Sequence, residues 1–132
     1  MDLEILNIAS NTDNSRNIKN HTHFAKLKNS LCGDEVLIKL IIKNEKIVDF
    51  GYQGDSCVYC QASASLLSKM SINNKKNKLS ELCDDADSFF DGNFQIIEKK
   101  WQFLKKLFKK KNLTRKECIL LPFKTLKKIV SS

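Results

Sequence analysis

The chain has 132 residues, of which 42% are hydrophobic and 29% charged, as expected for one globular domain large enough to bury a core. One proline and four glycines exclude a loop-rich or low-complexity chain. The longest apolar run, Val36–Ile42, is too short to span a bilayer and is broken by Lys39. The acidic start lacks the basic and then apolar layout of a signal peptide, so the expected location is cytoplasmic.

The net charge of +8 is concentrated in residues 98–132, which hold 12 Lys or Arg residues against 2 acidic ones. Basic clusters attract phosphate groups and release counterions, so a nucleic-acid-binding module is one alternative function. The plainer interpretation is that these lysines solvate one face of an amphipathic helix. We therefore treat nucleic-acid binding as a distant alternative.

The first 28 residues predict a helix, a loop and an edge strand. Residues 2–9 fit a short helix with Leu3 and Leu6 facing inward, accompanied by Ile5 and Ala9. Residues 10–20 are rich in Asn, Asp and Ser and read as a loop. His21 and His23 are expected to be exposed loop histidines, with metal ligation the less favoured interpretation. Residues 23–28 alternate weakly and suit an edge strand, where lysines are common.

A β-hairpin is predicted from residues 35–53. Val36, Ile38, Leu40 and Ile42 recur with period two, residues 43–46 form a turn, and residues 47–53 form a second strand. The entrance and the exit of an antiparallel pair lie side by side. Cys32 and Asp34 at the entrance should therefore converge with Cys57 at the exit.

Cys57 belongs to the stretch 54–65, where a strand gives way to a helix-like run of Ala, Ser and Leu that continues from 61 to about 71. A thiol at such a junction meets free backbone N–H groups and the positive end of the helix dipole, which favour the thiolate. Five cysteines, an odd number at irregular spacing, argue for reduced thiols rather than a disulfide framework. Cys60 is either a packed bystander or a spare ligand or resolving thiol.

The second half of the chain is predicted to be helical. Leu79, Leu82 and a buried Cys83 suggest a short helix, followed by a solvated acidic turn over residues 84–87. A long amphipathic helix is expected after Asn93, with an apolar core face at Ile97, Trp101, Leu104 and Phe108. Pro122 suits the first position of a final helix whose apolar face holds Phe123, Leu126, Ile129 and Val130. Cys118 would then lie just ahead of a helix, as Cys57 does.

These residues together resemble a known family, the U-type iron–sulfur cluster assembly scaffolds (the IscU, SufU and NifU N-terminal domain type). The matching pieces are Cys32-Gly33-Asp34 before the hairpin, Gly54-Asp55-Ser56-Cys57 followed by Gln61-Ala62-Ser63-Ala64-Ser65, and a late Cys118. Within a single domain over residues 1–132, the family-like core spans 25–130 and residues 1–24 form a variable segment. The long gap between Cys57 and Cys118 resembles the SUF-type branch, and Glu117 stands where the ISC-type branch carries histidine.

The resemblance implies an α+β fold with a small antiparallel sheet of about three strands and helices on one face. It also implies that Cys32, Asp34, Cys57 and Cys118 form one exposed site for zinc, or for iron in a transient iron–sulfur cluster, with Cys60 as a substitute ligand. Three thiolates and a carboxylate suit such metals, and the carboxylate is the more exchangeable ligand.

By the same resemblance, Cys32 accepts persulfide sulfur from a cysteine desulfurase. Sulfur or a nascent cluster then passes to apo iron–sulfur proteins or carriers. The implied role is a scaffold or acceptor rather than a turnover enzyme, with no membrane partner. A purely structural zinc protein, with the same ligands and no sulfur transfer, is the other alternative.

Overall fold

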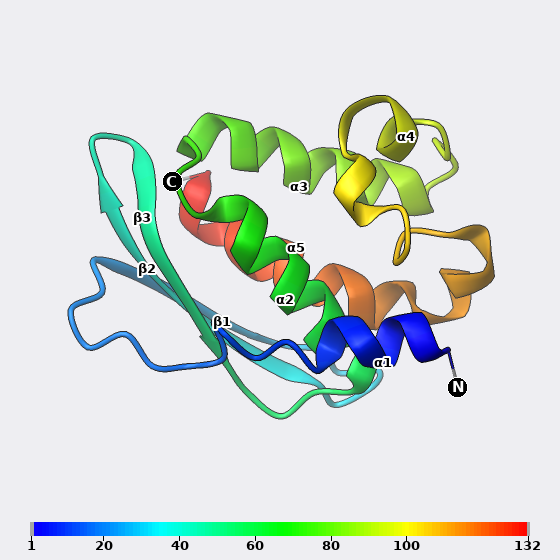
Figure 1. Ribbon diagram of the computed structural model, residues 1–132, viewed down its shortest axis with the longest axis horizontal. Coiled ribbons are helices and arrows are strands. Elements are labelled where there is room, and N and C mark those ends of the chain that lie inside the picture. The colour runs from blue at the N-terminus through cyan, green and yellow to red at the C-terminus, as the bar shows by residue number, and fades with distance from the viewer. Residues whose placement is uncertain (1, 132) are drawn as a thin grey trace.

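A computed structural model describes residues 2–131, which fold into a three-stranded sheet and a set of helices in one domain (Figure 1). The elements in chain order are α1 (Leu3–Ala9), β1 (His23–Lys28), β2 (Glu35–Lys43), β3 (Lys46–Gln53), α2 (Val58–Ser71), α3 (Lys76–Phe90), α4 (Ile96–Lys100), the 3-10 turns η1 (Gln102–Leu104) and η2 (Lys110–Arg115), and α5 (Lys116–Val130). The predicted α+β class with a small antiparallel sheet is confirmed. Among residues 2–131, no helix has the length and apolar character needed to cross a lipid bilayer.

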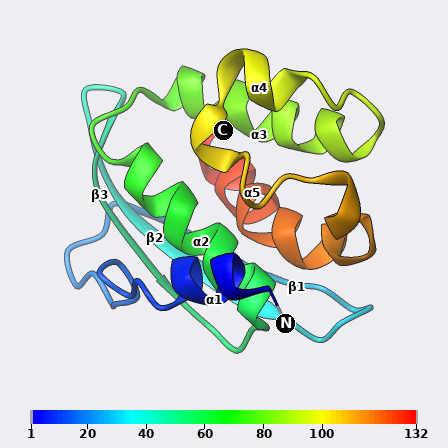
Figure 2. The same ribbon diagram turned by 45° about the vertical axis from the view of Figure 1, so that its right-hand side comes forward.

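The helices gather on one side of the sheet, as the two views in Figures 1 and 2 show. Helix α5 packs on β1 and β2, and α2 packs on β3. Helix α1 packs against α2, whereas α3 packs against α5 on the side away from the sheet. The core therefore lies between the sheet and the α2–α5 pair, with a second apolar layer between α5 and α3.

The predicted hairpin is confirmed, with strand order β1-β2-β3 and both pairs antiparallel. Val36, Ile38 and Leu40 are buried on one face of β2, as their period-two spacing predicts. The two turn residues Asn44 and Glu45 both have positive φ, the requirement of a tight two-residue hairpin turn. β1 is an edge strand, also as predicted.

Helix α1 exists as predicted, capped by the Asp2 carboxylate, but its predicted inward face is confirmed only for Ile5 and Ala9 and is wrong for Leu3 and Leu6. Leu3 and Leu6 are 78% and 40% exposed, whereas Ile5 and Ala9 are buried against α2. Helix α1 lies on the outside of α2, so only one narrow stripe of so short a helix reaches the core.

The predicted acidic turn over residues 84–87 is also wrong, because these residues lie inside the continuous helix α3. A stripe at helical spacing buries one face of α3, including Leu79, Leu82, Cys83, Ala86 and Phe90. Two of the carboxylates in this segment, those of Asp84 and Asp85, have partners on other elements. Asp84 accepts the Lys127 ammonium at 2.9 Å, and Asp85 accepts the Trp101 indole N–H at 2.8 Å.

The long amphipathic helix predicted after Asn93 is broken into α4, η1 and η2. Its apolar positions are nevertheless buried as predicted, including Ile97, Trp101, Leu104 and Phe108. The helix ends at Trp101, whose backbone leaves the helical region while its indole bonds to α3. The chain therefore folds back over the core instead of continuing straight.

Pro122 lies inside α5 rather than at its first position, so the predicted start of the last helix is wrong. α5 begins at Lys116, which places Cys118 in its first turn and not ahead of it. A proline inside a helix leaves the carbonyl four residues back without its usual donor, here that of Cys118. The next carbonyl, that of Ile119, accepts the buried Ser63 hydroxyl of α2 at 2.6 Å, which ties this turn of α5 to α2.

Candidate metal centre

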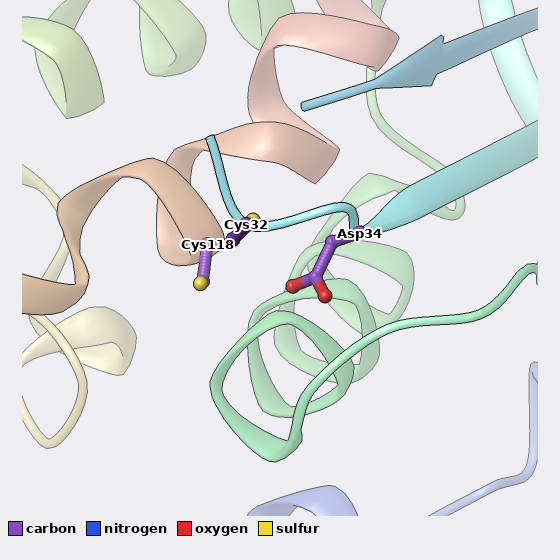
Figure 3. Close-up of side chains that lie close together, drawn as sticks. All are labelled: Cys32, Asp34 and Cys118. Atoms are coloured by element: carbon purple, nitrogen blue, oxygen red, sulfur yellow. The ribbon is translucent and has the colours of Figure 1, made fainter. Parts of the chain in front are cut away.

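The loop between β1 and β2 carries the first two candidate ligands, Cys32 and Asp34 (Figure 3). Gly33 between them has φ +77°, a left-handed conformation that glycine adopts without strain. This turn lets both neighbouring side chains approach the start of α5. Cys32 is exposed, whereas Asp34 is only 8% exposed.

Cys57 is the N-cap residue of α2 and comes directly after the exit of β3, as predicted. The hairpin places this exit beside the entrance of β2, because the Glu35 N–H donates to the Asp55 carbonyl at 2.8 Å. The Cys57 N–H itself donates to Oδ1 of Asp34 at 3.2 Å. The Asp34 carboxylate therefore accepts the backbone N–H of the N-cap residue of α2, whose own side chain makes no capping hydrogen bond.

Three candidate ligand atoms converge on one point. The thiol sulfurs of Cys32 and Cys118 and a carboxylate oxygen of Asp34 all lie within 4.8 Å of one another. Cys118 comes from the first turn of α5, so the group joins the hairpin entrance to the last helix (Figure 3). Cys57 falls outside this group, but its thiol is close enough to raise the pKa of Cys118.

The polar environment of the group suits a cation. Burial, followed by the neighbouring Cys57 and Cys32 thiols, raises the pKa of Cys118 because each disfavours a further thiolate. Oδ2 of Asp34 is buried and accepts no hydrogen bond within the described part of the chain. A buried carboxylate oxygen without a partner is costly, and a metal ion beside it would both satisfy the oxygen and favour the thiolates. The donor set of sulfur and oxygen fits zinc or cluster iron.

The remaining two cysteines and the two histidines do not belong to this group of three, although Cys60 is near enough for Asp34, Cys57 and Cys32 to raise the pKa of its thiol further. Cys60 and Cys83 are buried, and burial raises the pKa of each thiol to about 12. Cys83 is thus the packed residue that the sequence predicts, and Cys60 is packed in the core within the first turn of α2. His21 and His23 make local contacts with the Ile18 carbonyl and the Thr22 hydroxyl, and neither belongs to the group.

Comparison with known proteins places the chain in a family. Residues 3–85 match the family model described as "NifU-like N terminal domain". The chain belongs to this family. An iron–sulfur cluster assembly scaffold protein IscU of Thermotoga maritima is 33% identical over 102 residues, which are 76% of this chain and 70% of that protein. An uncharacterized protein of Borreliella burgdorferi is 31% identical over 103 residues, 78% of this chain and 71% of the relative.

Solved structures agree with this assignment. A crystal structure from Fervidobacterium islandicum, named as a candidate iron–sulfur cluster assembly scaffold protein for the SUF system, superposes with a TM-score of 0.86 at 25% identity. The match covers 98% of this chain and 96% of that one. A NifU-like N-terminal structure from Brucella abortus shares the fold, with a TM-score of 0.74, 18% identity and coverage of 98% and 91%. The predicted resemblance to the U-type family, including its SUF-like branch, is confirmed.

Proposed function

We propose that this protein is an iron–sulfur cluster assembly scaffold whose metal-binding group consists of Cys32, Asp34, Cys57 and Cys118. The observation that carries the proposal is the convergence of the Cys32 and Cys118 thiols with a carboxylate oxygen of Asp34, whose buried Oδ2 accepts no hydrogen bond from the residues that the structure describes. Cys57 supplies the fourth donor from the N-cap of α2, one backbone hydrogen bond away from Asp34. Cys60, held in the core, would serve as a substitute ligand only after the first turn of α2 had opened.

We further propose that Cys32 receives sulfur from a cysteine desulfurase. Its thiolate attacks the outer sulfur of the donor persulfide, the donor's S–S bond breaks, and the donor cysteine leaves as a thiolate. Cys32 then carries the persulfide. Cys32 suits this step because it is exposed on a loop, whereas Cys118 is buried and its pKa is raised. Sulfur or a nascent cluster would then pass to apo iron–sulfur proteins or carriers.

The resident metal decides between two forms of this function. A site that holds iron with sulfide is a cluster scaffold, and a site that holds zinc and accepts sulfur is a sulfur-transfer protein. A structural zinc site has the same ligands but a different outcome, because it takes up no persulfide from a desulfurase supplied with cysteine. The same incubation, followed by mass spectrometry of the protein, therefore separates transfer from a structural role.

The first test is metal and acid-labile sulfide analysis of anaerobically purified protein beside Cys32→Ser and Cys57→Ala variants. We expect iron with sulfide, or one zinc, in the wild type and a loss of metal in both variants. Cys83→Ala is the matched control, since it removes a buried cysteine outside the group and should retain the metal. A wild type without metal in any preparation, or a Cys57→Ala variant with full metal occupancy, would overturn the proposed site.

A further inference from the structure

The loop that carries Cys32 and Asp34 is organised by one residue, Asn29. The side-chain carbonyl of Asn29 accepts the N–H groups of Leu31 at 2.8 Å and Cys32 at 3.3 Å. Its backbone N–H donates to the Asp34 carbonyl at 2.8 Å, and its carbonyl accepts the Gly33 N–H at 2.8 Å. Four hydrogen bonds from a single asparagine thus set the shape of the loop between the strands.

The same side chain also reaches across to the last helix. The Asn29 amide donates to Oε2 of Glu117 at 3.3 Å in a partly buried contact between residues 88 positions apart. Glu117 directly precedes Cys118 in the first turn of α5. Its carboxylate also pairs with Lys124, about two helical turns further along α5, at 3.7 Å. We call the Asn29–Glu117 hydrogen bond the clasp.

The clasp joins the two halves of the candidate metal centre. One end holds the backbone N–H of Cys32, and the other belongs to the residue next to Cys118. This hydrogen bond between a carboxylate and an amide is partly buried and charge-assisted, and such a bond fixes direction as well as distance. It links the loop segment that carries Cys32 to the turn of α5 that carries Cys118.

We propose that Asn29 and Glu117 are positioning residues that preorganise the Cys32 loop for metal binding and sulfur acceptance. The role rests on the proposed function and assigns neither residue as a ligand. Groups that orient ligands from outside the coordination shell typically change metal affinity by roughly 10–100-fold when removed. We expect a loss in this range for the metal affinity of an Asn29→Ala variant.

The decisive experiment reverses the polarity of the clasp. N29D keeps an acceptor for the loop N–H groups but sets a carboxylate against the Glu117 carboxylate, so Co²⁺ affinity should fall at least about tenfold. The double variant N29D/E117Q restores a donor–acceptor pair in the opposite sense, with the introduced amide donating to the introduced carboxylate. We expect it to recover most of the lost affinity and the wild-type thiolate-to-cobalt charge-transfer spectrum. Lys124→Ala is the control, because it removes the ion pair and leaves the clasp.

A double variant that binds Co²⁺ no better than N29D, or an Asn29→Ala variant with wild-type affinity, would overturn the proposal. Amide hydrogen exchange of the metal-free proteins provides a readout independent of metal. The Leu31 and Cys32 amides should exchange faster in Asn29→Ala than in the wild type, and unchanged rates would count against the clasp. If the wild type binds no Co²⁺ while these amides respond as expected, the proposed function fails and the structural part of the clasp stands.

Discussion

Asp34 is the residue whose environment most clearly separates stability from function. Oδ1 accepts the Cys57 N–H, whereas Oδ2 is buried among described residues that offer it no donor. An unsatisfied buried polar atom costs about 1–3 kcal/mol, more when it is charged. The metal-free protein therefore retains a destabilising group at the point where its candidate ligands meet.

Asp34→Asn should consequently raise stability and lower metal affinity together. The amide keeps an acceptor for the Cys57 N–H but removes the buried charge, so we expect about 1 kcal/mol of added stability in the metal-free protein. Zinc affinity should fall at least about tenfold with the loss of the anionic ligand. Urea unfolding without metal and a chelator competition assay measure the two effects. Asp55→Asn, which changes an exposed carboxylate two residues before Cys57, is the control and should change neither quantity. A destabilised Asp34→Asn protein would contradict the account.

The five thiols should differ sharply in reactivity. Cys32 is exposed, whereas Cys60 and Cys83 are buried, and burial raises the pKa of each of these two thiols to about 12. Only a very small fraction of Cys60 and Cys83 is therefore in the thiolate form at neutral pH. Iodoacetamide at pH 7.5 should alkylate Cys32 first and leave Cys60 and Cys83 unmodified in the folded protein. Peptide mapping by mass spectrometry gives the order, with urea-unfolded protein as the control that exposes all five. Early alkylation of Cys60 would mean that the first turn of α2 opens readily.

At the scale of elements, the site depends on how β3 passes into α2. Gly54 has φ +141°, and a Cβ at this position would lie 2.1 Å from the Glu35 carbonyl oxygen. That carbonyl belongs to the start of β2, one residue after Asp34. Glycine at 54 thus allows the exit of the hairpin to lie against its entrance, which is what brings Cys57 to Asp34.

Gly54→Ala should therefore damage both the fold and the site. The clash is with backbone, which cannot rotate away, and we expect a loss of at least about 3 kcal/mol together with weakened metal binding. Gly92→Ala is the matched control, because Gly92 also has positive φ (+120°) but has nothing within 4 Å of the added Cβ. It should cost only about 1 kcal/mol of backbone strain. Thermal unfolding measures the stability of both variants. Equal losses of stability would contradict the idea that Gly54 is needed for the close approach of the two backbone segments.

Across the whole molecule, the periodicity of apolar residues predicted the structures that depend on neighbouring residues, above all the hairpin. The alternation in β2 was enough for the hairpin, and the hairpin was enough to bring Cys32, Asp34 and Cys57 to one end of the sheet. The helix ends were missed where a distant partner decides them. Trp101 leaves its helix to bond Asp85 on α3, and Ser63 on α2 supports the α5 turn beside the buried Pro122.

The placement of Cys118 and the role of Asn29 show the same limit. A proline rule for helix starts put Cys118 ahead of α5, although packing holds Pro122 inside the helix. An asparagine three residues before a cysteine is a local turn signal, so the loop side of Asn29 was within reach of the sequence. Its contact with Glu117 could not be predicted in this way, because the two residues are 88 positions apart in the sequence.

The dependence of stability on acidic pH tests an ion pair between the N-terminal loop and the sheet. Arg16 in the N-terminal loop forms a two-nitrogen hydrogen-bonded pair with Asp49 on β3, and this hydrogen bond holds the pKa of Asp49 below its usual value. A folded-state pKa below the unfolded value of about 3.9 means that the stabilisation is present above that pH. It is lost as the pH falls through the folded-state pKa.

Asp49→Asn should therefore lower the melting temperature near neutral pH, by an amount equivalent to less than about 1 kcal/mol for so exposed a pair. As the pH falls below the pKa of Asp49 in the folded wild type, the melting temperatures of the wild type and the variant should converge. The wild-type carboxylate then carries a proton and no longer pairs with Arg16. Thermal unfolding by circular dichroism between pH 2 and 7 measures the difference. A constant gap across this range would show that the variant acts through lost packing and not through charge.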